Sequence, residues 1–175
     1  MLSDMATKFK LDHTPIFGPG YHNCSLIGLQ DLCVAAFPQS KTRPILFVLF
    51  QSFIDDINKL FLPCNVWVDG SFLTGKENPS DIDVWIILDL DVALNLTVDQ
   101  RQFIDDVNDP TKKYNKVIDG YAFVCYPFGH TLYGSDLDER QGWAEHIGLQ
   151  RDKQWCKGVA VLRIGETDVG LRLYP

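Results

Sequence analysis

The chain has 175 residues, the size of one ordinary domain that can bury a core without a disulfide or a structural metal. Hydrophobic residues make up 46% and charged residues 22%, which is typical of a globular protein and excludes a disordered chain. The 23 Asp and Glu residues outnumber the 16 Lys and Arg residues, the net charge is −7, and no basic run is present. This balance argues against extended binding along a nucleic-acid backbone, which depends on Lys and Arg contacts with phosphates.

The five cysteines form no C-x-x-C pair, and their odd number argues against a closed disulfide framework. The N-terminus lacks the apolar segment of a signal peptide, and the longest apolar run, at residues 45–50, is far too short to span a bilayer. We therefore expect a cytoplasmic protein without a membrane partner.

Residues 1–22 are rich in Pro and Gly and include the run Phe17-Gly18-Pro19-Gly20. They predict an irregular N-terminal arm, which either lies across the fold or is a disordered leader. Residues 23–175 contain no linker, repeat or low-complexity segment, so we predict a single domain there.

Two helical patterns follow the arm. From Ser25, apolar residues recur at helical spacing and stop at Pro38. Between residues 40 and 61 a broader apolar stripe includes Pro44, which a helix tolerates in its first turn. We expect this second helix to pack against a sheet.

Residues 66–88 contain two runs of β-branched and aromatic residues joined by a turn-rich connector, which predicts strands at about 65–69 and 81–88. Asp81 and Asp83 open the second strand, and side chains at i and i+2 of a strand share a face. Two such carboxylates suit a divalent cation, and a Gly-Ser corner suits a phosphate. The alternative is that both patterns are ordinary turns, where Ser and Asp bond to their own backbone.

The next segment carries a second Asp-x-Asp pair, Asp89 and Asp91. We assign it to a solvated turn, because it lies at the far end of the predicted strand. Thr97 and Gln100 then form a capping-box pattern, which predicts a helix that ends near residue 108.

The last third of the chain predicts a strand at residues 116–126 that contains one acidic residue, Asp119. His130 follows in a loop, where we expect a solvated side chain and not a catalyst. The remaining predicted elements are a short helix at 135–147 and an edge hairpin of strands at 158–164 and 169–173.

The combination of Gly70-Ser71, nine intervening residues and Asp81-x-Asp83, each half at a strand end, resembles the signature of the nucleotidyltransferase superfamily typified by DNA polymerase beta. Within it, the chain is similar to minimal nucleotidyltransferase-like proteins of bacteria and phages. The resemblance implies an α+β fold in two layers, with a small mixed sheet that is flanked by helices and carries the site at one end. It also implies a third carboxylate on a neighbouring strand. Asp119 is the candidate, and the alternative is a surface aspartate at a strand bend.

The activity that this resemblance implies is transfer of a nucleoside monophosphate from a nucleoside triphosphate to a hydroxyl of a protein, an RNA end or a small molecule, as in a toxin–antitoxin or phage-defence component. The implied ligands of Mg²⁺ or Mn²⁺ are Asp81, Asp83 and Asp119, and Asp119 would accept the proton of the attacking hydroxyl. The candidate nucleotide-binding residues are Gly70, Ser71, Thr74 and Lys76.

Two other hypotheses remain open. A degenerate domain could bind the nucleotide without turnover. Two features favour it: the spacing is nine residues and not ten, and the third carboxylate depends on Asp119 alone. A pure interaction module could bind a protein partner or a second copy of the chain through aromatic residues such as Trp143 and Trp155.

Overall fold

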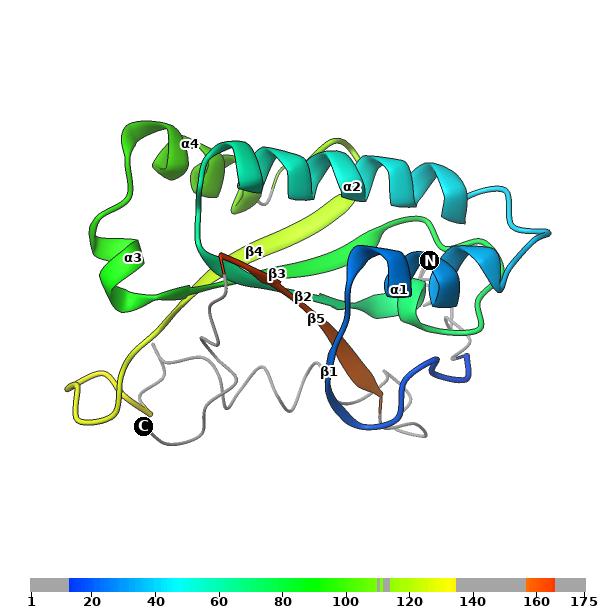
Figure 1. The fold of residues 1–175 in the computed structure, drawn as a ribbon, viewed down its shortest axis with the longest axis horizontal. Coiled ribbons are helices and arrows are strands. Elements are labelled where there is room, and N and C mark those ends of the chain that lie inside the picture. Colours follow the sequence, from blue (N-terminus) through cyan, green and yellow to red (C-terminus); the bar gives the residue numbers. More distant parts are fainter. Residues whose placement is uncertain (1–12, 110, 112–113, 135–156, 166–175) are drawn as a thin grey trace, which may run out of the picture.

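The computed structural model describes residues 13–109, 111, 114–134 and 157–165, which form one mixed five-stranded sheet with helices packed on it (Figure 1). The elements in chain order are β1 (Gly20–Asn23), α1 (Leu26–Gln30), the π-helical turn η1 (Asp31–Ala35), α2 (Arg43–Lys59), β2 (Cys64–Asp69), the 3₁₀ turn η2 (Gly70–Leu73), β3 (Ile82–Asp89), α3 (Leu90–Leu94), α4 (Val98–Val107), β4 (Ile118–Cys125) and β5 (Gly158–Ile164). The predicted class, α+β with a small mixed sheet flanked by helices, is confirmed.

The strands lie in the order β1-β5-β2-β3-β4. β2 is antiparallel to both of its neighbours, β3 and β5, whereas the pairs β3/β4 and β1/β5 are parallel. β5 matches the predicted run at residues 158–164, but the prediction of an edge hairpin is wrong for it, because β5 lies between β1 and β2 inside the sheet. The other half of that hairpin, at 169–173, and the helix at 135–147 lie outside the described residues.

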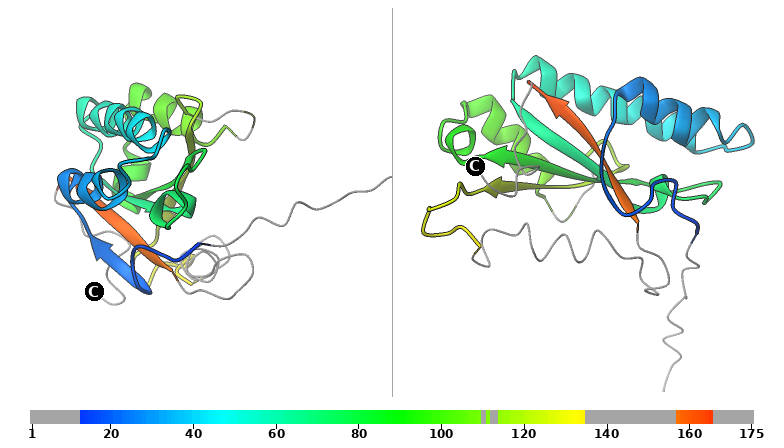
Figure 2. Two further views of the ribbon diagram at one scale, coloured as in Figure 1. Left: turned by 90° about the vertical axis from the view of Figure 1, so that its right-hand side faces the viewer. Right: turned by 60° about the horizontal axis from the view of Figure 1, so that its bottom comes forward.

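The main core lies between the sheet and α2, which stays on one side of the sheet in all three views (Figures 1 and 2). Alternate residues of β2 and β3 face this helix, as the period of two in a strand requires. The buried residues of this layer include Phe47, Phe50, Phe53, Ile54 and Ile57 of α2 with Val66 and Val68 of β2 and Val84 and Ile86 of β3. Because these positions fill the helix side, the intervening residues of each strand lie on the other face.

The N-terminal arm is more ordered than predicted over the residues that the structure describes. Its end forms β1, an edge strand parallel to β5, and Pro15 makes an isolated bridge with Thr74. The Ile16 N–H also donates to the Leu73 carbonyl at 2.9 Å. Gly and Pro do not prevent pairing at a sheet edge, where one side of the strand has no ladder to satisfy.

The helices differ from the predictions mainly at their ends. The first one continues from α1 into the π-helical turn η1, and the second, α2, begins only at Arg43. Asp89 and Asp91 are exposed at the far end of β3, as predicted, but they lie at the start of the short helix α3 and not in a turn. The predicted capping box of α4 is present, with both the Thr97 and the Gln100 side-chain bonds.

Cys33 and Cys64 are free thiols in the core, and burial raises the pKa of each to about 12. A thiol with so high a pKa behaves as a small apolar side chain. In the described part of the chain, no helix combines the length and the apolar character that crossing a bilayer requires.

Candidate functional site

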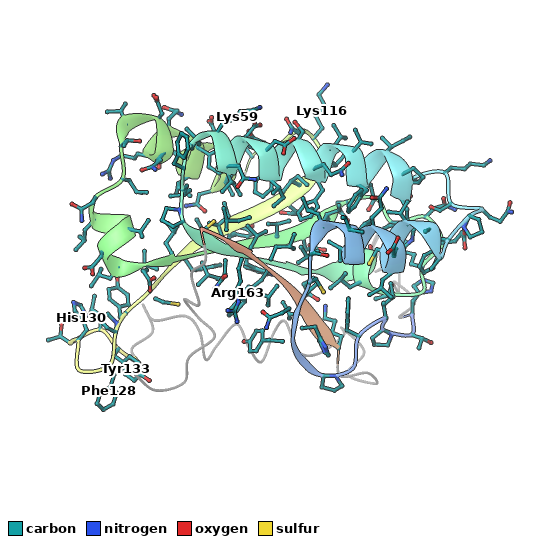
Figure 3. The ribbon with its side chains drawn as sticks, in the orientation of Figure 1. Lys59, Lys116, Phe128, His130, Tyr133 and Arg163 are labelled. Atoms are coloured by element: carbon teal, nitrogen blue, oxygen red, sulfur yellow. The ribbon has the colours of Figure 1, made fainter. Side chains whose placement is uncertain are left out.

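Three aspartates form a row across the sheet on the face opposite α2. Asp69 at the end of β2 is in register with Asp83 of β3, and Asp83 is in register with Asp119 of β4. Side chains of directly paired residues point to the same face, with Cβ atoms about 5 Å apart. In Figure 3, Arg163 of β5 marks this face, since it projects away from the helices. The predicted residues Asp83 and Asp119 are therefore neighbours.

Asp81 directly precedes β3, so the prediction that the strand begins at Asp81 is wrong by one residue. It nevertheless lies near Asp83, because its charge is one of the causes that raise the pKa of that carboxyl. Ser80 donates a hydrogen bond to Asp81 Oδ1 at 3.1 Å. The structure thus brings the predicted pair together at the entrance to β3.

The electrostatic centre of this group is Asp83. Burial, followed by the charges of Asp81, Asp69 and Asp119, raises its pKa from 3.8 to about 6, and Lys157 partly opposes this rise. Such a shift means that the ionised form has too little positive charge around it. A divalent cation would supply that charge.

Asp69 is a member of this row that the sequence interpretation did not use. It is 5% exposed, and its Oδ2 accepts a hydrogen bond from Lys157 Nζ at 2.9 Å. Burial raises the pKa of Asp69, and Lys157 opposes that rise. The only local signal for Asp69 is a carboxylate that ends an apolar strand directly before Gly70, and no local signal exists for Lys157, which is 88 residues away.

Gly70 brings the backbone of the connector against Asp83. Its φ of +77° lies in the left-handed region, and a Cβ at this position would overlap the Asp83 carboxylate. Ser71 follows as a half-buried residue of the 3₁₀ turn η2. The predicted phosphate corner and the predicted carboxylates are therefore adjacent in space.

The other two predicted nucleotide-binding residues are part of the internal bonding of the connector. Thr74 is 5% exposed, and its hydroxyl donates to the Ser71 carbonyl at 2.9 Å. The same hydroxyl accepts a bond from the Lys76 N–H at 3.3 Å. Thr74 thus stabilises the turn that presents Ser71.

Arg43, the first residue of α2, holds the connector in place. Its side chain is fully buried and donates to the carbonyl oxygens of Phe72, Thr74 and Lys76 at 2.6–2.8 Å. It also donates to the Cys33 carbonyl at 2.7 Å. These bonds link α2 and the turn η1 to the segment between Ser71 and Asp81. The shape of the site therefore depends on the buried guanidinium of Arg43, which no sequence pattern indicates.

The fit of a cation can be judged from these residues. Within the ranges that the structure describes, no three His, Cys, Asp or Glu side chains are arranged as a complete set of metal ligands. Mg²⁺ commonly uses only one or two protein carboxylates and takes waters and substrate phosphates for the rest. Asp83 and its neighbours meet that smaller requirement.

Comparison with known proteins gives one match. A family model described as a family of unknown function (DUF6932) matches residues 9–163, which include every site residue named above. No curated protein and no solved structure matches the chain. The chain therefore belongs to this family of unknown function, DUF6932.

Proposed function

We propose that this protein transfers a nucleoside monophosphate from a nucleoside triphosphate to an acceptor hydroxyl, in a reaction that depends on Mg²⁺ or Mn²⁺. The observation that supports it most strongly is the position of Asp83. This carboxylate is flanked by three others and packs against Gly70 of the phosphate corner. Carboxylates beside a glycine turn suit a substrate that brings both phosphates and a cation.

Asp83 and Asp119, with Asp81 beside them, are the residues that would hold the cation. When bound, such a cation neutralises phosphate charge and aligns the attacking and leaving oxygens. Two carboxylates in register on neighbouring strands provide fixed positions for it, because the sheet sets the separation of their backbones.

The other residues bind the substrate and move one proton. Gly70 permits the close approach of backbone N–H groups to the terminal phosphates, and the Ser71 hydroxyl donates a hydrogen bond to them. Asp119 accepts the proton of the attacking hydroxyl, and that oxygen forms the new bond to the α-phosphorus as pyrophosphate leaves. The acceptor is a protein, an RNA end or a small molecule, since the net charge of −7 does not favour extended nucleic acid.

A second candidate function is nucleotide binding without turnover. It is favoured by the lack of a complete three-ligand set among the described residues. A protein of this kind would bind a nucleotide with its own cation through two carboxylates, and it would lack the geometry that activates the acceptor.

The test is to incubate the full chain with each common nucleoside triphosphate, labelled at the α-phosphate, with Mg²⁺ or Mn²⁺ and cell extract. The proposal predicts a labelled product that disappears in Asp83→Asn but persists in Asp105→Asn, which changes an exposed carboxylate of α4. Nucleotide binding without any labelled product identifies the second candidate. Neither binding nor product would refute both.

A further inference from the structure

Lys157 and Asp69 form a mostly buried ion pair at the end of the aspartate row. We propose that Lys157 takes the place of a divalent cation beside Asp69 in the cation-free protein, and that it moves to the phosphates of the substrate when the cation binds. This inference rests on the proposed function. It assigns Asp69 as a cation ligand and Lys157 as a phosphate-binding residue.

Both charges of the pair are mostly buried. The side chains of Lys157 and Asp69 are 13% and 8% exposed, and their charged atoms are 2.9 Å apart. Taking two charges out of water costs several kcal/mol per ion, so a buried pair is weak evidence of a purely stabilising role. A pair that lies beside three further carboxylates instead points to a use for both charges.

One oxygen of the Asp69 carboxylate is unsatisfied. Asp69 Oδ1 is buried and has no hydrogen bond within the described part of the chain, although the adjacent Gly70 backbone N–H, like Lys157, lowers the pKa of this carboxyl. Buried carboxylate oxygens are rarely left without a donor, and an exception calls for a specific cause. Because Asp69 is in register with Asp83 and its charge acts on that carboxyl, a cation beside Asp83 would also lie within reach of Asp69.

Lys157 has an anchored backbone and a long, flexible side chain. Its backbone is anchored next to Gly158, whose N–H donates to the Phe17 carbonyl at 3.2 Å and which pairs with Gly20 of β1. The side chain, in contrast, is a flexible stem with a compact ammonium group. An anchored backbone and a long, rotatable side chain would allow the ammonium to exchange Asp69 for a phosphate without a change in the fold.

Charge balance favours this exchange. Together with Lys157, the four carboxylates carry a formal charge of −3; they are Asp69, Asp81, Asp83 and Asp119. A divalent cation reduces that charge to −1 but is repelled by the nearby ammonium. A bound triphosphate attracts the same ammonium, so Lys157 should weaken cation binding alone and strengthen binding of the phosphate chain.

The experiment measures both effects on the full-length chain. Mn²⁺ affinity is measured alone, and the affinity for inorganic tripolyphosphate is measured with Mn²⁺ present, for wild type and Lys157→Met. Removal of the ammonium should tighten Mn²⁺ binding roughly three- to tenfold and weaken tripolyphosphate binding roughly tenfold. Lys59→Met is the matched control, because Lys59 also pairs with an aspartate at 2.9 Å but lies on α2, on the outer side of the helix layer (Figure 3).

Two further variants keep the result decisive. Lys157→Gln retains a hydrogen-bond donor for Asp69 and replaces Lys157→Met if that variant does not fold. Asp69→Asn, added to either, should remove the gain in Mn²⁺ affinity. Unchanged or weaker Mn²⁺ binding in the Lys157 variants would overturn the inference. If Asp83→Asn binds Mn²⁺ as tightly as wild type, the proposed function fails instead, so the two failures are distinguishable.

Discussion

Replacement of Asp83 by asparagine should stabilise the cation-free protein at neutral pH. The Asp83 carboxyl is half-buried, lies near three other carboxylates, and has a pKa of about 6 in the folded chain against 3.8 ordinarily. Asparagine has nearly the same shape but no charge, so the substitution removes the repulsion. When replacement of a charged residue stabilises a protein, that residue typically serves function at a cost in stability.

The magnitude follows from the two pKa values. Between pH 3.8 and about 6 the folded chain holds a proton on Asp83 that the unfolded chain has released. The free energy of unfolding therefore falls as the pH rises through this window, and the full penalty is present above it. About two pKa units correspond to roughly 3 kcal/mol, an upper limit because the asparagine amide at this half-buried position also loses contact with water.

The assay is urea unfolding of wild type and Asp83→Asn in a chelator, near pH 4 and near pH 7.5. The variant should be more stable by up to roughly 3 kcal/mol at the higher pH and nearly equal at the lower one. Asp105→Asn, at an exposed site in α4, should show no such pH-dependent difference. If Asp83→Asn is less stable than wild type at the higher pH, the carboxylate is already compensated and the argument for a cation fails.

Three other substitutions test the structure around Asp83. Gly70→Ala should destabilise the protein by at least about 1–3 kcal/mol in urea unfolding, because it adds backbone strain and an overlap with the Asp83 carboxylate. Gly75→Ala is the control and should unfold almost as wild type, because a Cβ there has its nearest contact at 3.6 Å. Arg43→Met should lower the free energy of unfolding by at least about 3 kcal/mol in the same assay, since four carbonyl groups lose a charged donor. Arg101→Met in α4 should lower it little, and equal losses in the two variants would contradict the role of Arg43. Asp119→Asn should weaken nucleotide binding in calorimetry far less than it weakens transfer, because Asp81 and Asp83 still hold the cation but the base is lost. Transfer should fall by on the order of a hundredfold or more, and full transfer would exclude Asp119 as the base.

Local pattern predicted the elements that carry the site. α2 is buried on one face and β2 and β3 on one or both faces. Their buried positions are apolar, so the period of each element is visible in the sequence. The β-branched runs of β2 and β3 also placed Asp83 on a strand. Asp119 is the only acidic residue of its predicted strand, which makes it the candidate third carboxylate. Its register with Asp83 is a property of the parallel pairing, which no local pattern encodes.

The missed features all depend on contacts between distant segments. β1 lies in a Gly- and Pro-rich stretch and becomes a strand because β5 pairs with it, and β5 is interior for the same reason. Lys157 meets Asp69 only when β5 lies beside β2. Arg43 resembles an ordinary helix-start residue in the sequence, and only the fold brings the carbonyl groups of the connector around it.

The most direct test of the central claim is calorimetric titration of the full chain with nucleoside triphosphates in Mg²⁺ and in excess chelator. If Asp83 and its neighbours bind the nucleotide through a cation, binding should be measurable with Mg²⁺, should weaken strongly in chelator, and should be lost in Asp83→Asn under both conditions. Equal affinity with and without Mg²⁺, or undiminished binding in Asp83→Asn, would contradict the account.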